Sequence, residues 1–501
     1  MPQNIVFFTS YTPLWGVHYD TELELIQNHI DLGDHVTQLF CDGELAACDA
    51  NTGHFLESCY QCQTRRTNGV KRIEGKLNQQ NLLNLTAADK KNIAALPQAF
   101  ETIKKLQDLY IQNFDIGYAA ASSVVTATRN PNTDLQKYQK LTQRYLTSAA
   151  ATFFSLKNYL SQHPTDIVYV FNGRFAHQRA VLRACQQLGV SCYIHERGQT
   201  KNHYNLTKNA LPHEFSYIKN KMWQLWNEEN PETRLKIGAQ YFTDRAKGVE
   251  QHWKSFTVSQ KKDLLPPQWN VNKRNIVLFC SSEDEYVSLG KEYDYPFYTD
   301  QLSGIKQIVE SIKSDQNTHL YVRIHPNMID FATEIVAAYH QILQHNVTII
   351  ASDSPVSSYA LMHQASIVLC FGSIMGLEAT FWGKPSVLLG SMTYGGLNAV
   401  YEPTSHQALM ELIYTPNLEP KPAESVLVFG YYMYNFGTPF KFFVGETVTE
   451  GTFKGKKITD GSEKWAFKTI KNILNTTLFN RSLSLVLGYV SAQKLVKKYT
   501  N

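Results

Sequence analysis

The feature that most constrains this chain is a regular alternation of apolar strands and amphipathic helices between residues 275 and 391. Its strands are continuous apolar runs, which is typical of a parallel sheet covered by helices on both faces. Strand–helix alternation over this length predicts a doubly wound α/β domain. We expect its strands at 275–282, 319–324, 347–354, 366–373 and 385–391.

The first half of the chain repeats this alternation less regularly. We expect its strands at 4–10, 35–41, 167–174 and 191–198, with a largely helical insertion at about 42–162. A length of 501 residues exceeds one compact core, and the polar stretch 263–275, with two prolines, marks a boundary. The sequence therefore predicts three parts: an N-terminal Rossmann-like domain at 1–265, a second one at 266–420, and a helical segment at 421–501 that packs back on the first domain.

The composition narrows the class of protein. With 43% hydrophobic and 18% charged residues the chain is globular, and a net charge of +4 does not predict nucleic-acid binding. We expect a cytoplasmic protein, because no signal-peptide pattern and no apolar run of membrane-spanning length is found. The basic stretch around Lys468, Lys471, Lys494, Lys497 and Lys498 indicates either peripheral contact with the inner membrane or a helix bracing the N-terminal domain.

One predicted strand, at 319–324, ends abruptly at His325, Pro326 and Asn327. Proline cannot continue the ladder and biases the preceding residue to extended geometry, so His325 is held at the carboxyl end of the strand. Open α/β sheets bind their ligands at that edge. Taken alone, the stretch also fits a histidine that only caps a strand.

Two further loops follow strands at the same edge and carry small or hydroxyl side chains. A helix N-terminus in such a loop offers free backbone N–H groups and the positive end of a dipole, which bind anions. Ser373, the predicted N-cap, and His325 are expected to contact a phosphate, whereas the carboxylate of Glu378 suits a ribose diol. The residues predicted to bind a nucleotide are His325, Pro326, Asn327, Ser357, Ser358, Gly372, Ser373, Gly376 and Glu378.

The stretch SSYALMHQASIVLCFGSIMGLEATFWGKPSVLLG resembles the donor-domain signature of bacterial surface-polysaccharide glycosyltransferases of the capsule-synthesis type. The His-Pro pair also resembles the motif with which bacterial sialyltransferases and β-Kdo transferases hold a CMP-sugar. Such enzymes have the GT-B layout, in which two Rossmann-like domains face each other across a cleft. The resemblance implies a glycosyltransferase that moves a sugar from a nucleotide-activated donor to a surface polysaccharide or glycolipid. A CMP-sugar such as CMP-Kdo is favoured over a UDP-sugar.

Inverting transfer needs a base that deprotonates the acceptor hydroxyl, and we expect this base on the N-terminal domain. Glu196, at the end of a predicted strand, is the first candidate, and His18, after the first strand, is the second. The related families carry an acidic-x-Gly or acidic-acidic-Gly motif here, whereas this chain has Glu-Arg-Gly, so Glu196 and Arg197 could also form an exposed loop pair. Asn172, Arg174 and Arg197 are predicted to bind the acceptor.

Four cysteines, Cys41, Cys48, Cys59 and Cys62, fall close together and end in a C-x2-C pair. This spacing allows a structural zinc site, but four reduced thiols are an equal alternative. Because no Asp-x-Asp motif stands at a strand end, no catalytic metal ion is expected.

Two alternatives to glycosyl transfer stay open on the sequence. A non-hydrolysing sugar-nucleotide epimerase shares the GT-B layout but has no acceptor to accommodate, and the long insertion at 42–162 argues against it. A non-catalytic module would keep the nucleotide-binding scaffold within a capsule assembly complex.

Overall fold

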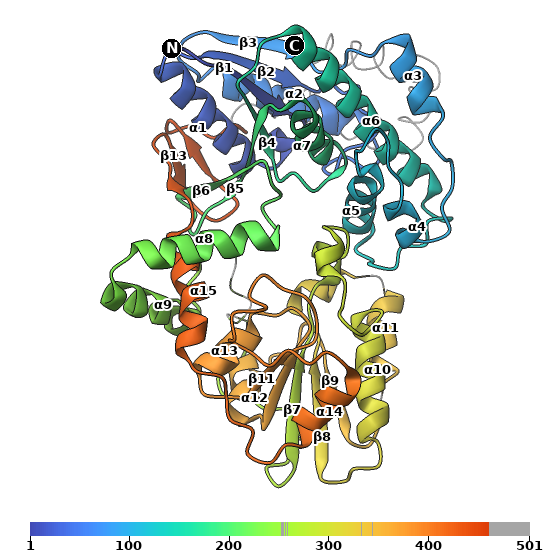
Figure 1. The fold of residues 1–501 in the computed structure, drawn as a ribbon, viewed down its shortest axis with the longest axis vertical. Coiled ribbons are helices and arrows are strands. Elements are labelled where there is room, and N and C mark those ends of the chain that lie inside the picture. Colours follow the sequence, from blue (N-terminus) through green and yellow to red (C-terminus); the bar gives the residue numbers. More distant parts are fainter. Residues whose placement is uncertain (252–254, 256, 258, 332, 343, 460–501) are drawn as a thin grey trace. The chain divides into compact units, whose positions relative to one another are not determined.

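The computed structural model describes residues 1–251, 255, 257, 259–331, 333–342 and 344–459. The chain divides into two compact units (Figure 1). Unit 1 contains residues 1–128, 132–212 and 437–459 of the described chain, and unit 2 contains residues 129–131 and 213–436. Each is built on its own sheet, and the α/β class predicted from the sequence is confirmed.

Unit 1 has a seven-stranded sheet in the order β12-β6-β5-β4-β1-β2-β3, in which β5 to β3 run parallel and β6 and β12 are antiparallel. Val6 and Phe8 face a core formed with α5, α6 and α7, while Ile5 and Phe7 face α1 on the other side. The strands are β1 (Asn4–Thr9), β2 (His35–Phe40), β3 (Leu77–Asn81), β4 (Ile167–Phe171), β5 (Ser191–Arg197), β6 (His203–Lys208) and β12 (Thr438–Pro439).

The helices of unit 1 cover both faces of this sheet. They are α1 (Val17–Asp31), α2 (Leu56–Val70), α3 (Ala87–Ala94), α4 (Ile103–Gln107), α5 (Ile116–Thr128), α6 (Gln139–Gln162) and α7 (Ala176–Leu188). The insertion expected to be helical also contributes β3, which adds to the edge of the sheet beside β2. Its sequence, LNQQN, is polar and largely exposed, so no apolar alternation signalled a strand there.

Unit 2 has a five-stranded parallel sheet in the order β11-β10-β7-β8-β9. Alternate residues of β7 again face opposite layers: Val277 and Phe279 face α12, α13 and α15, whereas Ile276 and Leu278 face α10 and α14. The strands are β7 (Arg274–Phe279), β8 (Thr318–Arg323), β9 (Val347–Ile350), β10 (Ile367–Cys370) and β11 (Ser386–Leu388).

The helices of unit 2 begin well before its first strand. They are α8 (Phe215–Glu228), α9 (Pro231–Ala246), α10 (Gln301–Ile312), α11 (Thr333–His340), α12 (Ser358–Gln364), α13 (Met375–Phe381), α14 (His406–Tyr414) and α15 (Glu424–Asn435). Because α8 and α9 pack on α15 and share the core of unit 2, the structure divides the chain between residues 212 and 213 rather than at 265.

The C-terminal segment predicted at 421–501 is divided in the same way. Helix α15 belongs to unit 2, whereas residues 437–459 belong to unit 1, where β12 pairs with β6 and the backbone N–H groups of Lys441 and Phe442 donate to Glu24. The hairpin of β13 (Phe443–Gly445) and β14 (Gly451–Phe453) follows. The basic stretch with Lys468, Lys471, Lys494, Lys497 and Lys498 lies outside the described residues. Within the described part, no helix is both long and apolar enough to span a membrane.

Candidate functional site

Both sheets have the strand order of a Rossmann fold, read as β3-β2-β1-β4-β5 in unit 1 and β9-β8-β7-β10-β11 in unit 2. The chain therefore reverses direction across the sheet between β1 and β4, and again between β7 and β10. In open α/β sheets, ligands bind outside the carboxyl ends of the strands at this switch point. Each unit thus has one place where a ligand site is expected from topology alone.

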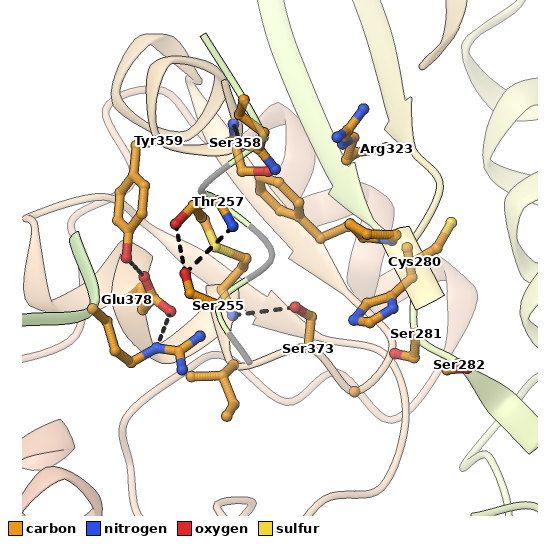
Figure 2. A pocket seen from close by; sticks show the side chains of 18 of the residues that line it. Ser255, Thr257, Cys280, Ser281, Ser282, Arg323, Ser358, Tyr359, Ser373 and Glu378 are labelled. Atoms are coloured by element: carbon orange, nitrogen blue, oxygen red, sulfur yellow. Dashed lines mark hydrogen bonds and ion pairs between the residues drawn. The ribbon is translucent and has the colours of Figure 1, made fainter. Parts of the chain in front are cut away.

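In unit 2 this place is hollowed into a cavity of about 320 Å³ (Figure 2). Its volume falls at the lower end of the range of small-molecule sites. Residues that follow β7, β8 and β10 meet in its lining. The residues predicted to bind a nucleotide that do line it are His325, Pro326, Ser358, Gly372, Ser373 and Glu378.

His325 is held by its own turn. Its Nδ1 accepts a hydrogen bond from the backbone N–H of Asn327 at 3.1 Å, which caps the short 3-10 turn Pro326–Asp330. Burial lowers the pKa of His325 to about 4, with further contributions from Arg323 and Arg129. The imidazole is therefore neutral at pH 7, and because Nδ1 accepts, the ring carries its proton on Nε2. His325 can thus offer a ligand the N–H of a neutral ring.

Three of the residues predicted to bind the nucleotide do not line the cavity. Asn327 donates its side-chain amide to Glu285 at 2.6 Å, and Ser357 accepts the N–H of Ala360 as the N-cap of α12. A Cβ on Gly376 would lie 2.6 Å from Cys370 Sγ, so this glycine allows α13 to pack on β10. Helix α13 begins at Met375, with Ile374 rather than Ser373 as its N-cap, although Ser373 Oγ accepts the N–H of Met375 at 3.2 Å.

Glu378 is fully buried and already has two protein partners. Arg245 Nε donates to Glu378 Oε1 at 2.8 Å, and the hydroxyl of Tyr359 donates to Glu378 Oε2 (Figure 2). The ion pair and the tyrosine hydroxyl compensate the carboxylate charge where it is removed from water. Glu378 therefore links α9, α12 and α13 in addition to lining the cavity, and the ribose contact expected from the sequence stays a prediction.

The lining residues that sequence patterns did not indicate include Arg245, Ser281 and Arg323. Arg245 and Ser281 carry no local signal, because the residues that form the cavity with them are distant in the sequence. Arg323 did have a signal: it is a charged residue in the apolar stretch HLYVRIHPN, two positions before His325, and strand periodicity places such residues on one face.

In unit 1, Glu196 and Asn172 meet at the switch point. Asn172 follows β4 and donates its side-chain amide to Glu196 Oε1, near the end of β5, at 2.5 Å. Asn172 and Gly173 both adopt left-handed backbone conformations, with φ of 59° and 76°, and this turn aims the amide back at β5. Burial raises the pKa of Glu196, which makes its carboxylate a stronger base.

His18 and Arg197 form the second contact of this edge. His18 lies in the first turn of α1, where a loop was expected, and its ring packs on Phe171 with centroids 4.1 Å apart. Arg197 Nη2 lies 3.3 Å from His18 Nε2, and no described residue forms a hydrogen bond with the buried Nδ1 of His18. Burial, Arg197 and His195 hold the pKa of His18 well below its ordinary value, so the imidazole is neutral. Arg174, the remaining predicted acceptor residue, lies over the ring of Phe175 at 4.3 Å.

A buried polar network behind this edge was not predicted. Glu22 accepts the hydroxyl of Thr9 at 2.6 Å, Gln38 donates to the same hydroxyl at 2.9 Å, and His195 Nε2 lies 3.6 Å from the other Glu22 oxygen. All four side chains are essentially inaccessible to solvent. Glu22 follows His18 by one helical turn, so α1 carries both groups to the end of β1.

The four clustered cysteines line one small cavity of about 30 Å³, and the structural zinc site stays a prediction. Across the described residues, no three Cys, His, Asp or Glu side chains are arranged to hold a metal ion. Cys62 Sγ donates to the carbonyl of Ser10, and Cys59 Sγ accepts from Asn51. Burial raises the pKa of Cys41, Cys48 and Cys62, which disfavours the thiolates that zinc needs.

A match to a known family covers parts of both units. Residues 158–406 match the family model described as "Capsule polysaccharide biosynthesis protein". The match is just under half of the chain, and it includes β4, β5 and the whole sheet of unit 2. The predicted resemblance to the capsule-synthesis family is therefore confirmed over these residues. Among curated proteins, none matches the sequence.

Solved structures with some similarity include two structures described as β-Kdo transferases. The β-Kdo 2,4 transferase KpsC of Thermosulfurimonas dismutans is 12% identical, with 53% of this chain and 78% of that chain covered and a TM-score of 0.33. The β-Kdo 2,7 transferase KpsC of the same organism is 15% identical, with 55% and 79% covered and a TM-score of 0.34. The S. aureus MnaA–UDP structure is 10% identical, with 95% and 97% covered and a TM-score of 0.26. Because these scores are low, the α/β assignment rests on the two sheets themselves.

Proposed function

We propose that this protein is a glycosyltransferase that moves a sugar from a nucleotide-activated donor to a bacterial surface polysaccharide or glycolipid. The observation that carries the proposal is the cavity at the switch point of unit 2. Side chains from three successive loops meet there, within the residues that match a capsule polysaccharide biosynthesis family. The donor is expected to bind in this cavity and the acceptor on unit 1.

The charges of the cavity support a donor with one phosphate. Within the described part of the chain two arginines line it, and Arg245 is paired with Glu378, so that Arg323 is the guanidinium without a carboxylate hydrogen-bond partner there. A sugar linked to CMP brings a single phosphate charge, whereas a UDP-sugar brings two. We therefore favour a CMP-sugar such as CMP-Kdo over a UDP-sugar, and we expect no catalytic metal ion.

For the base, the hydrogen bonds favour Glu196 over His18. The guanidinium of Arg197 can only donate, so Nε2 of the neutral His18 ring acts as acceptor and Nδ1 carries the proton. In that tautomer His18 has no lone pair left for the acceptor hydroxyl. Glu196 keeps carboxylate lone pairs beyond the one that Asn172 occupies, and its pKa is raised by burial. We propose Glu196 as the general base and Asn172 as the residue that positions it.

The test is turnover by the purified full chain. CMP-Kdo, CMP-sialic acid and a panel of UDP-sugars are supplied with and without an oligosaccharide or glycolipid acceptor, and released nucleotide and sugar products are measured. Nucleotide release that depends on an acceptor is the expected result. Conversion of a UDP-sugar to its epimer without any acceptor would instead show an epimerase, and nucleotide binding without turnover of any donor would indicate a non-catalytic module.

A further inference from the structure

Arg323, the last residue of β8, is a buried positive charge in unit 2. Its side chain is 2% exposed, although it is a full cation that lines the cavity together with His325. Burial lowers the pKa of Arg323 to about 10, so the guanidinium remains charged at neutral pH. Removing such a charge from water is costly unless another charge or several hydrogen bonds compensate it.

Among the described residues, the partners of Arg323 do not include a carboxylate within hydrogen-bond distance. Nη1 donates to the carbonyl of Ala351 at 2.7 Å and Nη2 to the carbonyl of Ser354 at 3.0 Å. Nε is buried and has no hydrogen-bond partner in the described part of the chain. Asp353 acts on the guanidinium only at longer range. The two carbonyls fix the plane of the side chain, but they leave its charge without a close anion and one N–H without an acceptor.

Another buried arginine of this protein is compensated differently. Arg179 in unit 1 is 3% exposed, and its Nε and Nη2 both donate to Asp115, at 3.0 Å and 2.5 Å. Arg179 therefore has the carboxylate that Arg323 lacks. The two side chains thus differ in whether a carboxylate lies beside the guanidinium. Arg323, which has none among the described residues, lines the cavity.

A second buried donor faces the same cavity. Ser281 follows β7, and its hydroxyl makes no hydrogen bond of good geometry among the described residues, although the hydroxyl of Tyr286, which also lines the cavity, lies close enough to interact with it. A Cβ on Gly372 would lie 3.1 Å from this hydroxyl and 3.0 Å from Met392 Sδ, so the glycine keeps the space in front of Ser281 open. In Figure 2 Ser281 and Arg323 both lie away from the Glu378–Tyr359 pair, on the other side of the cavity.

We propose that Arg323 supplies the positive charge that binds the donor phosphate, and that the hydroxyl of Ser281 is a second contact to the same anion. This inference rests on the proposed function, because it assigns the phosphate of a nucleotide donor to this cavity. It assigns the positive charge that binds the phosphate to Arg323, which lies outside the signature residues predicted from the sequence. His325 then contributes a neutral N–H.

The experiment compares nucleotides with their nucleosides by isothermal titration calorimetry on the full chain. CMP and cytidine, and UDP and uridine, are titrated into the wild type, Arg323→Gln and Arg274→Gln. Glutamine keeps donors for the carbonyls of Ala351 and Ser354 but removes the charge. Arg274 is a matched control: it lies at the opposite end of the sheet, donates to the carbonyl of Thr415 at 3.0 Å, has a buried Nε without a partner, and does not line the cavity.

We expect the wild type to bind the nucleotide more tightly than the nucleoside. The ratio of the two affinities should fall by about 10- to 100-fold in Arg323→Gln, as for the loss of a charge-assisted hydrogen bond. Arg274→Gln should leave the ratio unchanged, Arg323→Lys should restore part of it, and Ser281→Ala should lower it by less than 10-fold. If Arg323→Gln does not fold, Arg323→Met takes its place.

A folded Arg323→Gln variant that keeps the wild-type ratio would overturn the proposal for Arg323 while leaving the proposed function intact. A wild type that binds neither nucleotide more tightly than its nucleoside would overturn both. Equal losses in Arg323→Gln and Arg274→Gln would show a general effect on the sheet and would also contradict the proposal.

Discussion

The two sheets of this protein share the order of five strands, yet the buried charged groups at their carboxyl edges have different hydrogen-bond partners. In unit 1 the polar groups of the switch point contact one another: Asn172 donates to Glu196, and Arg197 lies against His18. In unit 2 the corresponding place contains a cavity, and Arg323 points its guanidinium at backbone carbonyls only. A fold that repeats within one chain therefore does not repeat its chemistry.

The difference has a physical interpretation. A carboxylate that accepts a hydrogen bond from a neighbouring amide can serve as a base in a fixed position without a ligand, whereas a buried cation without a close carboxylate gains most when an anion arrives. We interpret the edge of unit 1 as preorganised for proton transfer and the edge of unit 2 as preorganised for binding a charged donor. The following experiments test this contrast, from the largest expected effect to the smallest.

Replacing the proposed base should have the largest effect. Glu196→Gln keeps the hydrogen-bonding shape beside Asn172 but removes the proton acceptor, so we expect kcat to fall by about 10²- to 10⁴-fold. His18→Gln should lower kcat by less than about 10-fold, since its lone pair already faces Arg197. Steady-state kinetics with the donor identified by the turnover assay measures both, and calorimetry should show unchanged donor binding. A larger loss in His18→Gln than in Glu196→Gln would reverse the assignment.

Breaking the buried Arg245–Glu378 pair in unit 2 should lower the unfolding free energy more than breaking the Asn172–Glu196 pair in unit 1. Glu378→Gln leaves Arg245 without its carboxylate, and because the side chain of Arg245 is 31% exposed we expect a loss of about 2 kcal/mol in unfolding free energy. Glu196→Gln, whose partner is the neutral Asn172, should cost less than about 1 kcal/mol. Urea denaturation gives both values, with Glu310→Gln in an exposed pair as the control. Equal costs for the two buried carboxylates would remove the contrast.

Acid sensitivity should reveal buried neutral histidines in both units, such as His325 in unit 2 and His177 in unit 1. The folded-state pKa is about 4 for His325 and about 3 for His177, below the ordinary value of 6.5, because burial disfavours the charged ring. The unfolded chain therefore binds more protons below pH 6.5, and stability should be lost as the pH falls from 6.5 toward 4. His325→Gln and His177→Gln should each make the melting temperature depend less on pH over that window. Each should remove about 2 kcal/mol of the pH-dependent change in unfolding free energy.

The exposed His163→Gln serves as the control for these two variants, and scanning calorimetry from pH 7 to pH 4 is the measurement. A wild-type melting temperature that stays constant over this window, or a His325→Gln profile identical to that of the wild type, would contradict a neutral His325.

Metal removal should have the smallest effect. The four cysteines of unit 1 do not form a metal-binding group in the structure, so chelation should leave the melting temperature and the donor affinity unchanged. Elemental mass spectrometry of the purified protein should find less than one zinc per chain. A stoichiometric zinc, lost together with stability on chelation, would show that Cys41, Cys48, Cys59 and Cys62 rearrange around the metal.

Sequence patterns predicted the central strands of both sheets because a parallel strand buried on two faces is a continuous apolar run. They did not predict β3, whose residues are polar and exposed, or the assignment of α8 and α9 to unit 2. Helix α9 packs on α15, which lies almost 200 residues further along the chain, and no local pattern encodes that contact.

The same division holds for the sites. The sequence by itself determined where loops must bring polar groups together, because the carboxyl ends of parallel strands share one edge; His325, Ser373 and Glu196 were found this way. Only the tertiary structure decided what those groups can do. Burial made His325 neutral, Arg245 and Tyr359 occupied Glu378, and Arg323 has no carboxylate within hydrogen-bond distance among the described residues. Charge and protonation depend on neighbours and on distance from water, and both are fixed only when the chain is folded.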